Sequence, residues 1–345
     1  MELKLIIDYL IISIIASIAI NSVLRNFAKS RKILIDSPDR SRKFHDRSTP
    51  VTGGLGILIA LLISGKLYID LNDLNGYMPN FSYHLMISSI FLVFAFLFDD
   101  YKGLNKYKRL IIQALISLYM IFFTGTSLEN LGDLFGFGNI TLGVMSIPFT
   151  IFCSIGIMNA FNMIDGINGL CSGYAMIGLL FMGFFSGLIY DSLLIIFIGS
   201  IIGFLLFNLS FLGQNREVFL GDHGSNLIGF WVAWCAIYCS QNELYSFEPI
   251  TAIWIVAIPL LDCIGLIFSR YRKNINWALP GRTHIHHKLM NRFSSNTTLV
   301  IIISVGLITN FFAIYMGNNY PAWVSTILFI MYGSHYYVFS YYVKK

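Results

Sequence analysis

Three acidic residues occur in contexts that suit metal-assisted phosphate chemistry. Asp99 and Asp100 are adjacent at the end of an apolar segment, and Asp222 lies in a Gly-Asp-His-Gly-Ser stretch that opens another. Their hard oxygens suit Mg²⁺ or Mn²⁺, which bind one or two carboxylates together with substrate phosphates. A solvated helix end that pairs with neighbouring lysines, or a plain helix cap at Asp222, is the alternative. We therefore predict that Asp222, Asp99 and Asp100 are metal ligands.

A second cluster combines amides with a carboxylate. Asn159, Asn162, Asp165 and Asn168 fall within eleven residues that end in glycine, inside an otherwise apolar region. Asn162 follows Asn159 by three residues, so the two share a helix face, and the following Asp-Gly pair predicts a break in the helix. A plain turn would not need two asparagines here. The pattern predicts a recognition site for a polar ligand.

Two further segments carry cations and imidazoles that could neutralise phosphate groups. One is a basic loop followed by a glycine-rich helix start, and the other contains His-Ile-His-His. A loop that only sets membrane orientation is the alternative for both, and zinc is a weaker one for the histidines, which have no cysteine nearby. The candidate substrate-binding residues in these segments are Lys43, His45, Arg282, His284, His286 and His287.

The composition indicates what must position these clusters. Of 345 residues, 56% are hydrophobic and 12% are charged, whereas a soluble domain would carry roughly 25% charged residues. The chain therefore needs a lipid bilayer as its main solvent. The net charge of +5 is confined to a few loops, so no nucleic-acid partner is expected. The five cysteines lie in apolar segments and are expected to be reduced packing residues.

We predict an all-α polytopic membrane protein with about eleven transmembrane helices, since each crossing needs about 20 apolar residues. All but Lys4 and Lys66 of the 23 Lys and Arg residues then fall on one side. The positive-inside rule places the N-terminus outside and the C-terminus in the cytoplasm, with every cluster on the cytoplasmic face. The predicted spans are residues 5–24, 51–68, 82–98, 109–124, 141–160, 170–189, 192–212, 225–240, 250–268, 298–316 and 321–342.

Taken in order, the clusters resemble those of the polyprenyl-phosphate N-acetylhexosamine-1-phosphate transferases, glycosyltransferase family 4. The resemblance covers residues 36–287 and runs from Arg-Lys-x-His through Asp-Asp and Asn-x-x-Asn-x-x-Asp-Gly to Gly-Asp-x-Gly-Ser and His-Ile-His-His. The last motif is most like that of the branch that places N-acetylglucosaminyl-1-phosphate on undecaprenyl phosphate, at the start of O-antigen (lipopolysaccharide), common-antigen or teichoic acid synthesis. The peptidoglycan branch, which transfers phospho-MurNAc-pentapeptide, carries a different histidine pattern.

The resemblance implies one integral membrane transferase domain over residues 1–345, in the inner (plasma) membrane with a cytoplasmic active site. It implies a UDP-sugar and undecaprenyl phosphate as substrates, UMP as product and Mg²⁺ as cofactor. It also implies roles: Asp222 is the main metal ligand, Asp99 and Asp100 are a catalytic pair, and Asp165, also a candidate catalytic acid, falls in the nucleotide-recognition segment. Asn159, Asn162 and Asn168 also belong to the nucleotide-recognition segment. Arg282 and the histidines belong to the loop that binds the diphosphate.

One residue departs from the family pattern. Asn168 stands where the family usually has a second aspartate, so a recognition role survives there and a proton-transfer role does not.

Several alternatives stay open at this stage. The chain could serve the peptidoglycan branch or, in another class, act as a transporter, although transporters place polar groups near the bilayer midplane. We expect direct attack by the lipid phosphate, with a covalent aspartyl intermediate as the competing scheme, and the oligomeric state, monomer or homodimer, is open.

Overall fold

The computed structural model describes residues 3–37, 47–71, 78–188, 191–242, 247–274 and 284–342. Our predictions for Lys43, His45 and Arg282 lie outside these residues. The described residues are mostly helical, with one short two-stranded ladder and a long non-helical stretch over residues 125–142. An all-α fold is therefore what the structure has.

The chain divides into two compact units, each built from two separate segments. The first unit comprises residues 1–112 and 189–227, and the second comprises residues 113–188 and 228–345. Helices α4 and α8 contribute their first residues to the first unit and the rest to the second. That the whole chain forms a single transferase domain stays a prediction.

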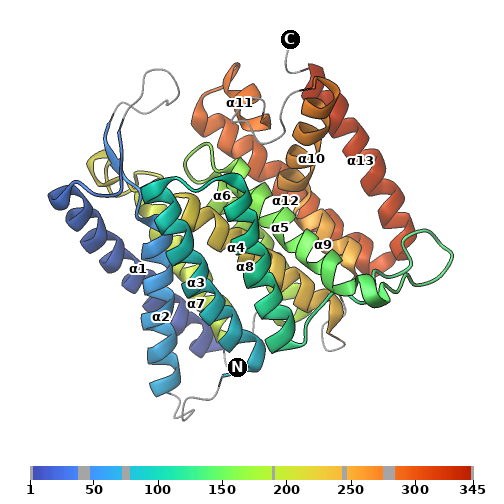
Figure 1. Cartoon of the computed structure of the whole chain (residues 1–345), viewed down its shortest axis with the longest axis horizontal. Helices are drawn as coiled ribbons and strands as arrows, with labels where there is room; N and C mark the ends of the chain where they lie inside the picture. The colour runs from blue at the N-terminus through green and yellow to red at the C-terminus, as the bar shows by residue number, and fades with distance from the viewer. Residues whose placement is uncertain are drawn as a thin grey trace. The chain divides into compact units, whose positions relative to one another are not determined.

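The first unit is built mainly from long helices (Figure 1). A ladder of two-residue strands, with Ile35 opposite Pro50, joins the loop after α1 to the start of α2. The elements of the first unit are α1 (Leu3–Arg31), β1 (Ile35–Asp36), β2 (Thr49–Pro50), α2 (Gly53–Leu71), α3 (Asn80–Lys102), the start of α4 (Lys106–Thr124), α7 (Ser192–Asn208), the 3₁₀ turn η3 (Gln214–Arg216) and the start of α8 (Asp222–Gln241).

Small residues let α1 and α7 of the first unit pack with their backbones close together. A Cβ on Gly199 would overlap the Ser13 hydroxyl, and one on Gly203 would lie 2.8 Å from the carbonyl oxygen of Ile14. The Ser17 hydroxyl also donates a hydrogen bond of 2.7 Å to the Ser200 carbonyl. Small residues on facing helices are how membrane helices associate when lipid removes the hydrophobic driving force.

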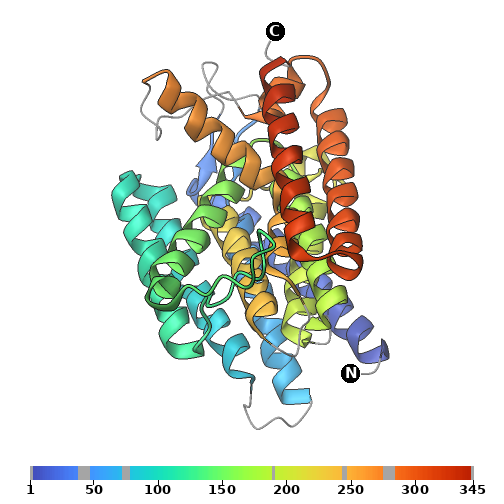
Figure 2. The same cartoon turned by 90° about the vertical axis from the view of Figure 1, so that its right-hand side faces the viewer.

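The second unit holds the remaining helices, of which α12 and α13 run side by side (Figure 2). Its elements are the rest of α4, the 3₁₀ turn η1 (Gly143–Met145), α5 (Ser146–Ile164), α6 (Leu170–Ser186), the rest of α8, α9 (Pro249–Ile255), α10 (Ala257–Arg272), α11 (Ile285–Met290), α12 (Ser295–Asn319) and α13 (Ala322–Tyr342).

Helices α9 and α10 meet at an angle of 80°, where we predicted one span over 250–268. The break follows from Pro259, which has no N–H to donate to the carbonyl of Ile255 four residues earlier. That carbonyl instead accepts hydrogen bonds from the Tyr174 hydroxyl at 3.2 Å and from Asn310 Nδ2 at 3.5 Å. Neighbouring helices thus satisfy the freed group, as a membrane interior requires.

Each of the eleven segments that we predicted as spans contains a helix or helix pair in the structure. Within the described residues, however, only six helices are long and apolar enough to cross a membrane, or seven if the bent α9–α10 pair counts as one span. Helices α6 and α7 have 17 residues each and rise only about 26 Å, while α8 and α13 are rich in polar and aromatic residues. The count of eleven, and the orientation that depends on it, stay predictions.

Candidate active site

Arg109 joins two of the predicted acids within the first unit. Its Nε lies 2.7 Å from Asp99 Oδ2 and its Nη1 lies 2.8 Å from Asp222 Oδ2. Asp99 is buried, and its other oxygen accepts a hydrogen bond of 2.5 Å from the backbone N–H of Leu104. The turn at Gly103, which has a φ of +69°, leads into α4 and so brings Arg109 back to the end of α3.

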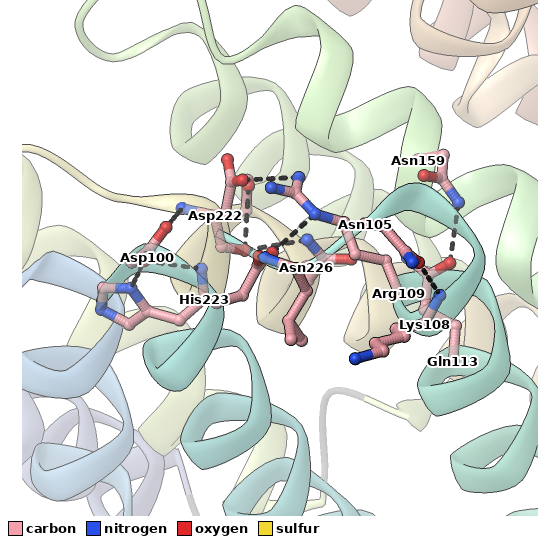
Figure 3. Close-up of polar contacts among 12 residues, drawn as sticks. Asp100, Asn105, Lys108, Arg109, Gln113, Asn159, Asp222, His223 and Asn226 are labelled. Carbon is pink, nitrogen blue, oxygen red and sulfur yellow. Dashed lines mark hydrogen bonds and ion pairs between the residues drawn. The ribbon is translucent and has the colours of Figure 1, made fainter. Parts of the chain in front are cut away.

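Asp100 contacts the first residues of α8 (Figure 3). Its Oδ1 accepts from the backbone N–H of Asp222 at 3.3 Å, and its Oδ2 accepts from the backbone N–H of His223 at 3.4 Å. The ring nitrogen Nδ1 of His223 is also hydrogen-bonded to Oδ2. A carboxylate at a helix N-terminus satisfies N–H groups that have no partner within the helix. The structure therefore places Asp99, Asp100 and Asp222 beside one another.

The backbone around Asp222 is held by the start of α2. Gly53 and Gly54 donate their N–H groups to the carbonyls of Phe219 and Leu220 at 2.9 and 3.0 Å. A Cβ on Gly54 would overlap the backbone of Gly224, so only glycine permits this approach. Gly221 turns the chain with a φ of +80° directly before Asp222. The glycines at 53 and 54 thus fix the position from which the Asp222 side chain leaves the helix.

The donor set suits a metal ion that is held largely by phosphate oxygens. Among the described residues, no group of three or more His, Cys, Asp or Glu side chains is placed to hold a metal by itself. Arg109 contacts both Asp99 and Asp222, and α8 contacts Asp100; of the three side chains, that of Asp222 is the most exposed, at 35%. Mg²⁺ usually takes one or two carboxylates and completes its shell with water and phosphate. Asp222 fits that pattern better than a cage of three acids does.

The described part of the first basic loop binds a turn within the same unit. Arg25 Nη1 and Lys29 Nζ donate to the carbonyl of Asn215 at 2.8 and 3.0 Å, and Arg47 Nη1 donates to its side-chain oxygen at 3.1 Å. These three cations therefore have a structural role in joining α1 and the α2 approach to η3. The predicted phosphate contact of this loop rests on Lys43 and His45.

In the second unit, the predicted amide cluster lies at the end of α5. Asn159 Nδ2 donates to Gln113 Oε1 at 2.9 Å, which ties α5 to α4 (Figure 3). The helix ends at Ile164, and Asp165 follows with a φ of −74° and a ψ of 52°, so the expected break occurs where the Asp-Gly pair begins. Asn168 lies in the turn before α6, which starts after Gly169 at a φ of +80°.

The histidine segment also belongs to the second unit and is anchored by a buried acid. Asp262 of α10 is 4% exposed; its Oδ2 lies 2.7 Å from His284 Nδ1 and its Oδ1 accepts from the backbone N–H of Ile285 at 2.9 Å. The Tyr336 hydroxyl donates to the same Oδ1 at 3.3 Å. Asp262 therefore pairs with His284. The pairing fixes the N-terminus of α11.

His286 lies deeper than its neighbours. It is 1% exposed, it stacks parallel to His284 with ring centroids 5.6 Å apart, and it packs on Gly166 beside Asp165. Neither ring nitrogen has a hydrogen-bond partner among the described residues. Burial, with a smaller contribution from the adjacent His287, lowers the pKa of His286 to about 3. The structure therefore brings the histidine motif against the Asp165-Gly166 turn and keeps His286 neutral.

The predicted residues thus form two groups, one in each unit, and sequence reasoning missed three members. Arg109 was counted only as a loop cation, because nothing in the sequence shows that the chain turns back at Gly103. His223 occupies the variable position of Gly-Asp-x-Gly-Ser, and only its burial in the structure indicates that it belongs to the site. Asp262 is an acid within an apolar segment, and nothing in the sequence shows that its partner is a histidine 22 residues away. The catalytic and binding roles of the predicted residues stay predictions.

Comparison with known proteins places these motifs in a family. The family model for glycosyl transferase family 4 matches residues 55–240. The chain is 32% identical over 323 residues to the undecaprenyl-phosphate alpha-N-acetylglucosaminyl 1-phosphate transferase of Escherichia coli strain K12, covering 90% of this chain and 84% of the relative. The enzymes of the same name from Yersinia pestis and Haemophilus influenzae are each 33% identical, covering 86% and 87% of this chain and 81% and 85% of their own lengths. The chain is a member of glycosyl transferase family 4.

Proposed function

We propose that this protein transfers N-acetylglucosamine-1-phosphate from UDP-N-acetylglucosamine to undecaprenyl phosphate, releasing UMP. Relatives that align with nine-tenths of the chain carry this acceptor and this sugar phosphate in their names. The observation that carries the proposal is the gathering of Asp100, Asp222 and Arg109 at the first turn of α8. That arrangement suits phosphoryl transfer, which depends on positioning and electrostatic stabilisation.

The reaction joins two anions. An oxygen of the lipid phosphate attacks the sugar-side phosphorus of the diphosphate, the new P–O bond forms, and the P–O bond to UMP breaks. Asp100 orients the attacking phosphate and accepts its proton, while Arg109 offsets charge near Asp222. A Mg²⁺ ion bound at Asp222 would supply further positive charge to the diphosphate. In the second unit, Asn159, Asn162, Asp165 and Asn168 recognise the nucleotide sugar, and the histidine segment binds the diphosphate.

The proposal extends to location and pathway. We place the enzyme in the inner membrane with its active site on the cytoplasmic side, where nucleotide sugars are made. The basic residues of the predicted loops support that orientation. The product, a lipid diphosphate sugar, is the starting point for a polymer that further glycosyl transferases would extend.

The test is UMP release from purified protein supplied with UDP-N-acetylglucosamine, undecaprenyl phosphate and Mg²⁺. Release that requires both the lipid and the metal is the expected result, and it would show that Asn168 is compatible with catalysis. Other UDP-N-acetylhexosamines and UDP-MurNAc-pentapeptide, assayed in parallel, decide the donor. Absence of release with every donor would overturn the proposed activity, and flux of a substrate across liposomes would then favour the transport alternative.

A further inference from the structure

His223 is a fully buried histidine that the proposed reaction has not used. It follows Asp222 in the first turn of α8 and is 0% exposed. Burying a polar ring is unfavourable unless it forms hydrogen bonds, and its Nε2 has no partner among the described residues. A packing role alone would be met by an apolar side chain at lower cost. The surroundings of the ring indicate another role.

Two glycines make the space in which the imidazole lies. A Cβ on Gly54 would come within 2.7 Å of His223 Cδ2, and a Cβ on Gly221 would come within 2.7 Å of both Cε1 and Nδ1. The ring is therefore enclosed between α2 and the loop before α8. In this slot it has one orientation, which directs Nδ1 at Asp100.

The contact with Asp100 combines three donors. The imidazole Nδ1 bonds to Oδ2, and the backbone N–H groups of Asp222 and His223 point at Oδ1 and Oδ2. Because Asp100 accepts two backbone hydrogen bonds as well, the proton of the third contact belongs to Nδ1. A histidine donates from Nδ1 both as the neutral Nδ1–H tautomer and as the cation, so the contact needs no particular charge on the ring. Three donors hold the carboxylate in one orientation.

This arrangement separates the roles of the adjacent acids. Asp99 is held by Arg109 and Leu104, and its side chain is fully buried. Asp100 keeps 14% of its side chain exposed, so its remaining lone pairs can meet a substrate group. A charge-assisted hydrogen bond that locks a carboxylate is how supporting residues make a catalytic group effective.

We propose that His223 is a positioning residue that orients Asp100 toward the lipid phosphate. The proposal rests on the proposed transfer reaction and adds to it a residue that sets the orientation of Asp100. It assigns a function to the position that the Gly-Asp-x-Gly-Ser pattern leaves variable.

The test separates hydrogen bonding from packing. His223→Leu fills the slot without donating, whereas His223→Asn places an amide N–H close to the position of Nδ1. We expect Leu to lower kcat by about tenfold or more, as loss of a hydrogen bond to a charged group does, with KM for the UDP-sugar unchanged. Asn should restore kcat to within about threefold of the wild type. His335→Leu, on an exposed part of α13, is the matched control and should change neither constant.

A Leu variant as active as the wild type, or an Asn variant as impaired as the Leu variant, would overturn the proposal. If His223→Leu fails to fold, His223→Ala takes its place in the same comparison. A double-mutant cycle on melting temperature, with His223→Leu and Asp100→Asn, tests the contact without turnover. Non-additive shifts support the contact, and additive shifts remove it. Failure of the wild type to release UMP would instead overturn the proposed reaction, so the two failures are distinguishable.

Discussion

His286 lies directly over the α-carbon of Gly166, with its Nε2 in the space that a side chain at that position would need. The contact joins the histidine motif of α11 to the turn that follows Asp165 in the second unit. Two motifs separated by 120 residues in the chain are therefore in contact, and the contact is possible because residue 166 has no Cβ. Any side chain at position 166 must move one of them.

We predict that Gly166→Ala lowers the transfer rate at least tenfold, because the added methyl displaces either His286 or the Asp165 turn. Overpacking of this kind costs about 1–3 kcal/mol of stability, so the protein should still fold. UMP release and thermal melting measure the two effects. The matched control is Gly156→Ala in α5, where a Cβ meets nothing within 4 Å. Equal activity of the two variants would contradict the prediction.

The stability of the protein should fall as the pH decreases below about 6.5. The unfolded chain binds a proton at His286 near its ordinary pKa of 6.5, while the folded protein resists protonation until about pH 3. Between these values the unfolded state holds the extra proton, so stability is lost on acidification by up to about 1.4 kcal/mol per pH unit. Melting curves between pH 4.5 and 7.5 measure the slope. His286→Asn should flatten it by one proton, and an unchanged slope would show that His286 is not the responsible group.

Removal of Arg109 should destabilise the first unit, because Asp99 is buried and would lose its cationic partner. We expect Arg109→Ala to cost about 2–3 kcal/mol, less than a fully buried pair, since the arginine side chain is 34% exposed. Replacing Asp99 by Asn in the same protein should recover part of this loss by removing the unpaired charge. Chemical unfolding in detergent compares the three proteins. A double variant less stable than Arg109→Ala would refute the account.

Asp222 should control the response to Mg²⁺. EDTA is expected to abolish UMP release and added Mg²⁺ to restore it, while Asp222→Asn should raise the Mg²⁺ concentration for half-maximal activity at least tenfold. Binding of Mn²⁺ in the presence of UDP-N-acetylglucosamine, followed by electron paramagnetic resonance, gives a readout that does not depend on turnover. Asp70→Asn is the control, since that side chain is exposed and paired with Lys66. Wild-type metal binding by Asp222→Asn would exclude Asp222 as the ligand.

Much of this architecture follows from local sequence. The apolar segments, the helix break at Asp165 and the start of α8 at Asp222 depend on composition and on neighbouring glycines, all of which the sequence displays. Asp99 and Arg109, by contrast, are ten residues apart in the sequence, and they come into contact only because the chain turns at Gly103. Likewise, Pro259 is visible in the sequence, but the 80° angle depends on Tyr174 and Asn310 reaching the freed carbonyl.

The buried histidines show the same limit. A polar residue between glycines or in a basic loop is expected at a surface, and nothing local indicates that His223 and His286 are enclosed. Their burial depends on glycines distant in sequence, Gly54 for His223 and Gly166 for His286. The motif pattern could therefore locate the candidate site, but it could not tell which imidazole is hydrogen-bonded to an acid and which has no hydrogen-bond partner among the described residues.

The close packing of α1 on α7 has a consequence for biosynthesis. The hydrogen bond between Ser17 and Ser200 joins residues 183 positions apart, so the first helix must stay in the bilayer without its main partner while the intervening chain is made. At ribosomal speeds of roughly 5–20 residues per second, that interval is about 10–40 seconds. Asp99 and Asp100 likewise lack their neighbours Asp222 and His223 until α8 has been synthesised. The chain therefore completes the cluster of Asp99, Asp100 and Asp222 late in translation, and a ribosome that stalls before residue 222 leaves a product without this cluster.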